Sequence, residues 1–246
     1  LMSQAGMNGG RALVQILNGE VNPSGKLTDT WPVNFDDNPS SEGFANQDGN
    51  TAQELYNDDI FVGYRYYDTF GVDVSYPFGY GGSYTSFAMS TKSVKADKDK
   101  VTVQVKVKNT GTVSGKEVAE VYFSAPEGNL DKPYQELAGY AKTDELAPGE
   151  SQVLTITYDT TEMGSYDTDK AAYVMEDGDY IIRVGNSSRN THVAAKLNVA
   201  EDTITEQYSN LMVPVTENPN IKNDEKYPTL NPMTTDGATP ITYAGE

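Results

Sequence analysis

Strict alternation of valine with polar residues is the feature that most constrains the fold of this chain. In the segment KVTVQVKVKNTG, which begins at Lys100, the residues Val101, Val103, Val105 and Val107 fall on one side of an extended chain. Successive side chains of a strand point to opposite faces, so this pattern predicts an antiparallel strand with one buried face and one wet face. Further strands are predicted at 117–124, 135–142, 151–158, 171–175, 179–185 and 192–199.

These strands define the fold class of most of the chain. About seven strands in roughly 110 residues, joined by turns and without helical periodicity, are typical of a β-sandwich of the immunoglobulin or fibronectin type III kind. Because the chain contains no cysteine, the fibronectin-like version is favoured. Asp177-Gly178 predicts a hairpin turn between two of the strands, and Pro148-Gly149 predicts another turn.

The first residues of the chain show a different period. Ala12, Leu13, Ile16 and Leu17 recur at helical spacing, so a short helix is predicted over Ala5–Gly19. The next stretch, NPSGKLTDTWP, predicts a strand over 26–31 that ends at the following proline, because proline cannot donate to a ladder.

A polar loop and an aromatic segment follow. Residues 34–54 are rich in Gly, Asn, Asp and Ser and predict a long surface loop. The apolar run over Ile60–Tyr64 predicts a buried strand, or a strand and turn. The segment VSYPFGYGGSYTSF combines five aromatic residues with three glycines; it is interpreted as a packed domain junction in preference to a ligand platform.

Composition excludes several classes of function. Acidic residues outnumber basic ones 36 to 18, giving a net charge of −18, which disfavours phosphate backbones and anionic membrane surfaces. No run approaches the ~20 apolar residues of a membrane span. Without cysteine there is no disulfide, thiolate metal site or cysteine nucleophile. The single histidine, His192, falls on the outward side of a predicted strand and is interpreted as an ordinary surface residue.

The periodicity ends near Ala200. The segment beyond it carries five prolines and no sustained pattern. It predicts an extended linker, or a strap over another domain.

Three blocks of sequence occur in an order that one known family shares. The first is AGMNGGRALVQILNGEVNPSGKLTDTWP and the second is FVGYRYYDTFGVDVSYPFGYGGSYTSF. The third comprises VKNTGTVSGKEVAEVYFSAP, DKPYQELAGYAKTDELAPGES and DGDYIIRVGNSSRN. Together, over roughly residues 3 to 200, they resemble the C-terminal half of glycoside hydrolase family 3, the β-glucosidases, β-xylosidases and relatives. One departure is Gly82, where family members often have leucine.

The resemblance implies a division of the chain. Residues 1–82 resemble the C-terminal portion of the family's α/β sandwich domain, with the surface loop at 34–54. Residues 83–200 resemble its fibronectin type III-like β-sandwich, and 201–246 form the Pro-rich linker or strap. The expected fold class is therefore mainly β, with a fibronectin-like sandwich preceded by the terminal fragment of an α/β sandwich domain.

The resemblance also implies a chemistry that this chain does not complete. Retaining glycosidases use two carboxyl groups about 5–5.5 Å apart. In this family the nucleophilic aspartate sits on a (β/α)8 barrel, and the acid/base is expected well upstream of Asn22. The acids of the first part match no catalytic motif: Asp36, Asp37, Glu42, Asp48, Glu54, Asp58 and Asp59. No catalytic, cofactor-binding or metal residue is therefore assigned, and no cofactor is implied.

The expected function is that of the non-catalytic C-terminal portion of a retaining, exo-acting β-glycosidase of β-glucosidase type. Its expected partners are the barrel and the rest of the α/β domain, with a β-linked glycoside as substrate, no nucleic acid, and a homodimer left open. The tail suits a permuted order in which the barrel follows, and the usual order also stays open. The alternative is a stand-alone carbohydrate-binding or structural module. Export is favoured over retention in the cell, although the compartment is not assigned.

Overall fold

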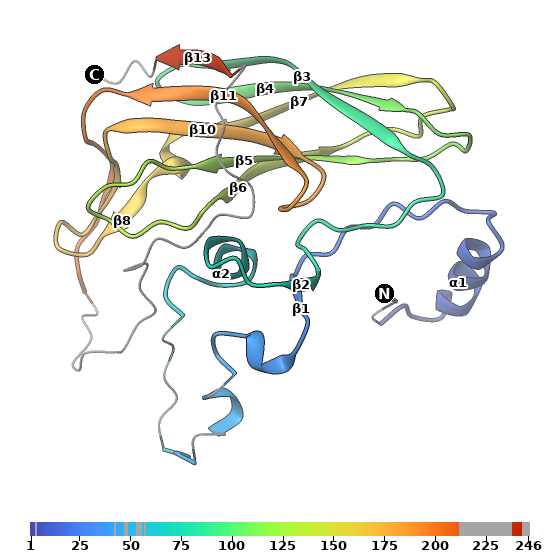
Figure 1. Cartoon of the computed structure of the whole chain (residues 1–246), viewed down its shortest axis with the longest axis horizontal. Coiled ribbons are helices and arrows are strands. Elements are labelled where there is room, and N and C mark those ends of the chain that lie inside the picture. Colours follow the sequence, from blue (N-terminus) through green and yellow to red (C-terminus); the bar gives the residue numbers. More distant parts are fainter. Residues whose placement is uncertain are drawn as a thin grey trace.

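The computed structural model describes residues 1–2, 4–41, 43–46, 49–52, 56, 58–211 and 238–242. Two facing sheets form a β-sandwich over most of this part of the chain (Figure 1). One sheet has the order β3-β4-β7, formed by Phe87–Ala96, Lys100–Asn109 and Ser151–Asp159. The other has the order β13-β11-β10-β5-β6, formed by Thr239–Thr242, Thr191–Val199, Gly178–Gly185, Val118–Ser124 and Glu136–Lys142.

The alternating valines of β4 lie at the centre of the sandwich. Val101, Val103, Val105 and Val107 are all 0% exposed and belong to one apolar cluster with residues of β5, β7, β10 and β11. Full burial of each such side chain contributes about 1.5–3 kcal/mol. The predicted strand, its buried face and the mainly β fold class are therefore confirmed.

The six further predicted strands are also confirmed. They are β5, β6, β7, β9 (Ala172–Met175), β10 and β11, each within one residue of its predicted bounds. The sequence did not predict β3, β8 (Ser165–Asp167), β12 (Thr203–Gln207) or β13. Three of these are short, and β3 carries a register shift between Thr91 and Ser93 that breaks its alternation.

The hairpin predicted at Asp177-Gly178 is wrong. β9 pairs with β8 and β12 in a separate three-stranded sheet, whereas β10 pairs with β5 and β11. The dipeptide instead turns the chain from one sheet into another, and Gly178 has a φ of +134°. A turn signal specifies the local backbone and not which strands pair. The turn at Pro148-Gly149 is confirmed, since Glu150 N donates to Ala147 O at 2.9 Å.

The N-terminal part lies against one side of the sandwich (Figure 1). Its helices are α1 (Gly9–Leu17) and α2 (Tyr64–Thr69), its short 3-10 turns are η1 (Phe35–Asp37) and η2 (Phe44–Asn46), and its strands are β1 (Trp31–Pro32) and β2 (Val74–Tyr76). A third 3-10 turn, η3 (Thr160–Met163), follows β7 in the sandwich. The helix predicted over 5–19 is confirmed with shorter bounds.

Two strand predictions in this part are wrong. Only Trp31 and Pro32 form a strand, and they pair with β2 of the same chain, so residues 26–30 are not a strand. The predicted strand over 60–64 is instead a loop that enters α2 at Gly63, whose φ is +58°. Within this run only Phe61 is fully buried, at 0% exposed, whereas Val62 is 52% exposed. A short apolar run cannot by itself distinguish a strand from a buried helical segment.

The tail and the predicted loop fall partly outside the described residues. Within 34–54, only 34–41, 43–46 and 49–52 are described. At the far end, β13 pairs in parallel with β11, and Ile241 packs against the core. None of the helices in the described part is long and apolar enough to cross a membrane.

Candidate functional site

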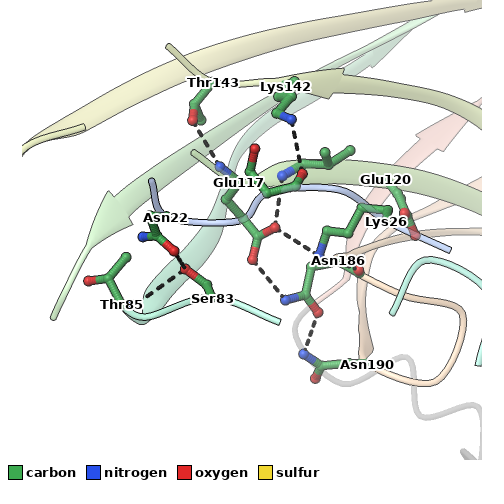
Figure 2. Close-up of polar contacts among 12 residues, drawn as sticks. Asn22, Lys26, Ser83, Thr85, Glu117, Glu120, Lys142, Thr143, Asn186 and Asn190 are labelled. Atoms are coloured by element: carbon green, nitrogen blue, oxygen red, sulfur yellow. Dashed lines mark hydrogen bonds and ion pairs between the residues drawn. The ribbon is translucent and has the colours of Figure 1, made fainter. Parts of the chain in front are cut away.

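A buried polar network around Lys26 joins the N-terminal part to the sandwich (Figure 2). Lys26 Nζ lies 2.8 Å from Glu117 Oε1 and donates to the backbone oxygen of Asn186 at 3.1 Å. The side chains of Lys26 and Glu117 are only 14% and 11% exposed. Glu117 Oε2 accepts a hydrogen bond from Asn186 Nδ2 at 3.1 Å. Each oxygen of the Glu117 carboxylate therefore contacts a donor: Oε1 contacts Lys26 and Oε2 contacts Asn186.

Asn22 forms a second connection, at the start of the NPSGK stretch. Its Oδ1 accepts from Ser83 Oγ at 3.1 Å and from Tyr84 N at 2.9 Å, while its Nδ2 donates to Ser114 O at 3.0 Å. Lys142 Nζ on β6 donates to Ser24 O at 2.9 Å. The stretch is thus fixed to both the aromatic segment and the sandwich.

A buried carboxyl group, Glu120 on β5, lies beneath the aromatic segment. Glu120 is 4% exposed, and Tyr122 Oη donates to its Oε2 at 2.7 Å. Burial raises the pKa of Glu120, and the bond from Tyr122 opposes that rise. A Cβ on Gly79 would lie 2.5 Å from Glu120 Oε2 and 2.8 Å from Ser187 Cα. The backbone at Gly79 therefore packs directly against this buried carboxylate.

Helix α2 is held to the sandwich by a third connection. Arg189 Nε donates to Asp68 Oδ1 at 2.9 Å, and Gln135 Nε2 donates to Asp68 Oδ2 at 3.1 Å. Arg189 also donates from NH2 to Val72 O at 2.6 Å. Asp68 is 3% exposed; burial raises its pKa, and the Arg189 guanidinium opposes the rise. This ion pair ties together residues more than a hundred positions apart in the chain.

Four of the seven acids considered from the sequence are described. Asp36 and Asp37 are on η1, where Asp37 Oδ2 accepts from Asn34 N at 2.7 Å and caps the turn. Asp58 is half-buried and Asp59 is exposed, in the loop before α2. Glu42, Asp48 and Glu54 are outside the described residues. That none of these acids is catalytic therefore stays a prediction.

Two further kinds of site were considered in the part of the chain that the structure describes: a metal site and a site around the single histidine. No group of three or more His, Asp or Glu side chains there could hold a metal ion. His192 is exposed on β11, as its position in the alternation predicted, and its Nε2 lies 3.1 Å from Thr91 Oγ1. Together, the three connections describe a junction that joins the N-terminal part to the sandwich.

Sequence reasoning located the junction but missed its charged residues. Lys26 and Asp68 fall inside the quoted blocks, yet their partners Glu117 and Arg189 are 91 and 121 positions away. One signal in the sequence could have marked Asp68: it lies within a run of aromatic residues, next to Tyr67. An acidic residue in such an apolar run is seldom buried unless it is paired.

Comparisons with known proteins address both parts of the chain. Residues 1–84 match the glycosyl hydrolase family 3 C-terminal domain, and residues 117–188 match the fibronectin type III-like domain. Beta-glucosidase A of Butyrivibrio fibrisolvens is 42% identical over 86% of this chain. Among solved structures, a beta-glucosidase from Paenibacillus barengoltzii is 45% identical, with a TM-score of 0.77 over 82% of the chain. Beta-glucosidase 3B from Thermotoga neapolitana, solved with α-D-glucose, is 42% identical, with a TM-score of 0.79 over 84%.

The coverage of these relatives is partial. This chain spans 28% of the Butyrivibrio enzyme, 23% of the Paenibacillus structure and 28% of the Thermotoga structure. It therefore corresponds to about a quarter of the proteins it resembles.

Proposed function

Because this chain belongs to glycoside hydrolase family 3 and corresponds to the C-terminal part of its enzymes, we propose that it is the scaffold portion of a retaining, exo-acting β-glucosidase. The substrate in this proposal is a β-linked glycoside whose O-glycosidic bond is hydrolysed. The observation that carries the proposal is the 42% identity to a β-glucosidase, which extends through both parts of the chain and the junction between them.

The geometry of the junction supports a scaffold role. Lys26, Asn22 and Asp68 each bond across the boundary between the N-terminal part and the sandwich. Buried ion pairs of this kind fix one relative placement, because separating them leaves uncompensated charge. The sandwich would then hold the end of the α/β domain rigidly, which is what precise placement of catalytic groups elsewhere in the enzyme requires.

The exposed apolar side of α1 supports a partner within the same enzyme. Met7, just before the helix, is fully exposed, Leu17 is 72% exposed and Val14 is 58% exposed. A helix normally buries such a stripe against another layer of its domain. We propose that the barrel and the remainder of the α/β domain provide that layer. Trp31, 42% exposed and packed edge-on against Tyr76, is a further exposed apolar group of the N-terminal part.

In this proposal the chain takes no chemical step. The two carboxyl groups of retaining hydrolysis act as nucleophile and acid/base, and both are assigned to the rest of the enzyme. The residues described here act by position: Glu117, Glu120 and Asp68 are engaged by neighbouring donors or closed off from solvent.

Hydrolysis of a chromogenic β-glucoside tests this function. The full-length parent protein should release the chromophore, whereas the 246-residue chain alone should release none. Replacing the parent's Lys26 by methionine, which breaks the junction, should lower activity together with thermal stability, and the exposed Lys92 replaced by methionine provides the matched control. A parent inactive on β-glucosides, β-xylosides and N-acetylglucosaminides would contradict the proposal.

Two finer parts of the proposal need separate tests. The division into 1–82, 83–200 and 201–246 predicts that limited proteolysis cuts near residues 82 and 200 before it cuts within the sandwich. The second part is that the parent enzyme forms a homodimer. Light scattering after size exclusion would measure its mass, and the mass of a single chain would contradict the dimer.

A further inference from the structure

We propose that three exposed tyrosines on the small sheet β12-β9-β8 form a binding site for a neutral β-glucan chain. Tyr166 lies on β8, Tyr173 on β9, and Tyr208 directly follows β12. This tyrosine patch is defined as these three residues. The inference rests on the proposed function for its choice of glycan, and on the geometry of the sheet for its location.

The strand register brings the tyrosines together on one face. Tyr166 is directly opposite Tyr173 in the β8–β9 pair, and their ring centroids are 5.2 Å apart. Tyr208 packs against the other side of Tyr173, at 6.0 Å between centroids. The rings thus form a row across β8, β9 and the end of β12.

The tyrosines are not part of the apolar core of the sheet. Their neighbours in β9, Ala172 and Val174, are 0% and 1% exposed and face inward, as alternation requires. Tyr166, Tyr173 and Tyr208 are 39%, 38% and 51% exposed. Aromatic side chains that keep this much surface in water are enriched at binding sites, because each offers an apolar ring and a polar tip.

Polar groups border the rings at positions suited to sugar hydroxyls. Glu206 is opposite Tyr173 in the β12–β9 register and accepts a hydrogen bond from the Tyr208 hydroxyl. Asn210 Oδ1 accepts from the Tyr166 hydroxyl at 2.9 Å. A carboxylate and an amide beside aromatic rings provide the acceptors and donors that a polyhydroxylated ligand needs, while the rings contact its C–H faces.

Charge and position decide between possible occupants. The chain's net charge of −18 and the carboxylate of Glu206 disfavour an anionic polysaccharide or a membrane surface, so the occupant is taken to be uncharged. In Figure 1, β8 lies at the opposite end of the sandwich from α1, whose apolar side is assigned to the rest of the enzyme. The patch would therefore remain accessible in the assembled protein, where it would retain the polymer whose ends the enzyme cleaves.

Affinity gel electrophoresis of the full chain in soluble mixed-linkage β-glucan tests the site. The wild-type chain should be retarded relative to a gel without glucan. Tyr166→Ala combined with Tyr173→Ala should raise the apparent dissociation constant by about tenfold. Tyr140→Ala is the matched control, because Tyr140 is 69% exposed on β6, away from the patch, and should leave retardation unchanged. Tyr173→Phe, which keeps the ring, should retain most of the retardation and guards against misfolding of the double variant.

Several outcomes would overturn the inference. They are unchanged mobility of the wild-type chain in β-glucan, equal loss in the Tyr140 control, and retardation only by an anionic polysaccharide. A wild-type dimer that becomes monomeric in the double variant would identify the patch as a contact between copies instead. If the parent protein is retarded by β-glucan but hydrolyses no β-glucoside, the site is supported and the proposed function is overturned. If it hydrolyses β-glucosides but is not retarded, the proposed function is supported and the site is overturned.

Discussion

Replacing Gly79 by alanine should weaken the junction between the N-terminal part and the sandwich. Gly79 has a φ of +79°, and an added Cβ would lie 2.5 and 2.6 Å from the oxygens of Glu120 and 2.8 Å from Ser187 Cα. The left-handed backbone costs a residue with a Cβ about 1–2 kcal/mol. Overpacking against backbone adds about 1–3 kcal/mol, since Ser187 Cα cannot rotate away. We expect Gly79→Ala to lower the free energy of unfolding of the junction by about 2–5 kcal/mol.

Gly82→Ala is the matched control, three residues along the same segment. A Cβ on Gly82 meets no atom within 4 Å, and its φ is not in the left-handed region. The change should leave stability within about 0.5 kcal/mol of wild type, or raise it slightly by restricting the unfolded chain. For the larger residue that the resemblance leads one to expect at this position, the structure shows only that its first side-chain carbon would meet no atom within 4 Å.

Urea unfolding followed by two signals measures the effect. Trp31 is the chain's only tryptophan and lies next to Tyr76, so its fluorescence reports on the N-terminal part. Circular dichroism reports mainly on the sandwich. Gly79→Ala should move the Trp31 midpoint to lower urea and leave the sandwich transition nearly in place. Identical Trp31 midpoints for the two glycine variants would refute the steric argument.

Three further predictions follow from other contacts. Glu120→Gln should stabilise the chain at pH 7 relative to wild type. Because burial raises the pKa of Glu120 in the folded state, wild type loses stability as the pH rises above the ordinary glutamate value of about 4.5, and the variant lacks that loss. Stability curves of the two proteins that stay parallel across pH would contradict this. Asp68→Ala should cost about 3–5 kcal/mol in urea unfolding, because Arg189 is left without its buried partner, and a loss under 1 kcal/mol would show that the ion pair is dispensable. Ile241→Asp should lower the melting temperature of the sandwich, because it places a charge against the core. Thr239→Asp is the control and should leave the melting temperature unchanged, because Thr239 is exposed. Equal melting curves for the two variants would mean that β13 adds no stability.

The sandwich could be predicted from the sequence because its information is local. Each strand from β4 to β11, apart from the short β8, alternates or forms an apolar run, and the strands were placed within one residue. Strand pairing is a different kind of information: the Asp177-Gly178 turn was recognised, but the tertiary arrangement placed β9 and β10 in different sheets. The apolar run over 60–64 was wrongly predicted to be a buried strand. The segment is a loop that enters α2, with Phe61 buried and Val62 52% exposed, because a short apolar run does not specify its secondary structure.

The junction could be located from the sequence but its contacts could not. The NPSGK stretch and the aromatic segment predict conformational constraint, and Asn22 does connect the two. The bonds from Lys26 to Glu117 and from Arg189 to Asp68 require knowing which loops of the sandwich face the N-terminal part. That placement depends on packing of whole layers, which no local pattern encodes.

The two ends of the sandwich differ in what their exposed apolar groups can do. At the α1 end, Val14 and Leu17 are aliphatic and carry no polar tip, so only burial against protein satisfies them. At the β8 end, the exposed rings are tyrosines with hydroxyls bonded to Asn210 and Glu206. Such groups tolerate water and favour a ligand that binds and leaves. The same physical criterion therefore distinguishes the proposed interface with the rest of the enzyme from the proposed reversible site for a β-glucan.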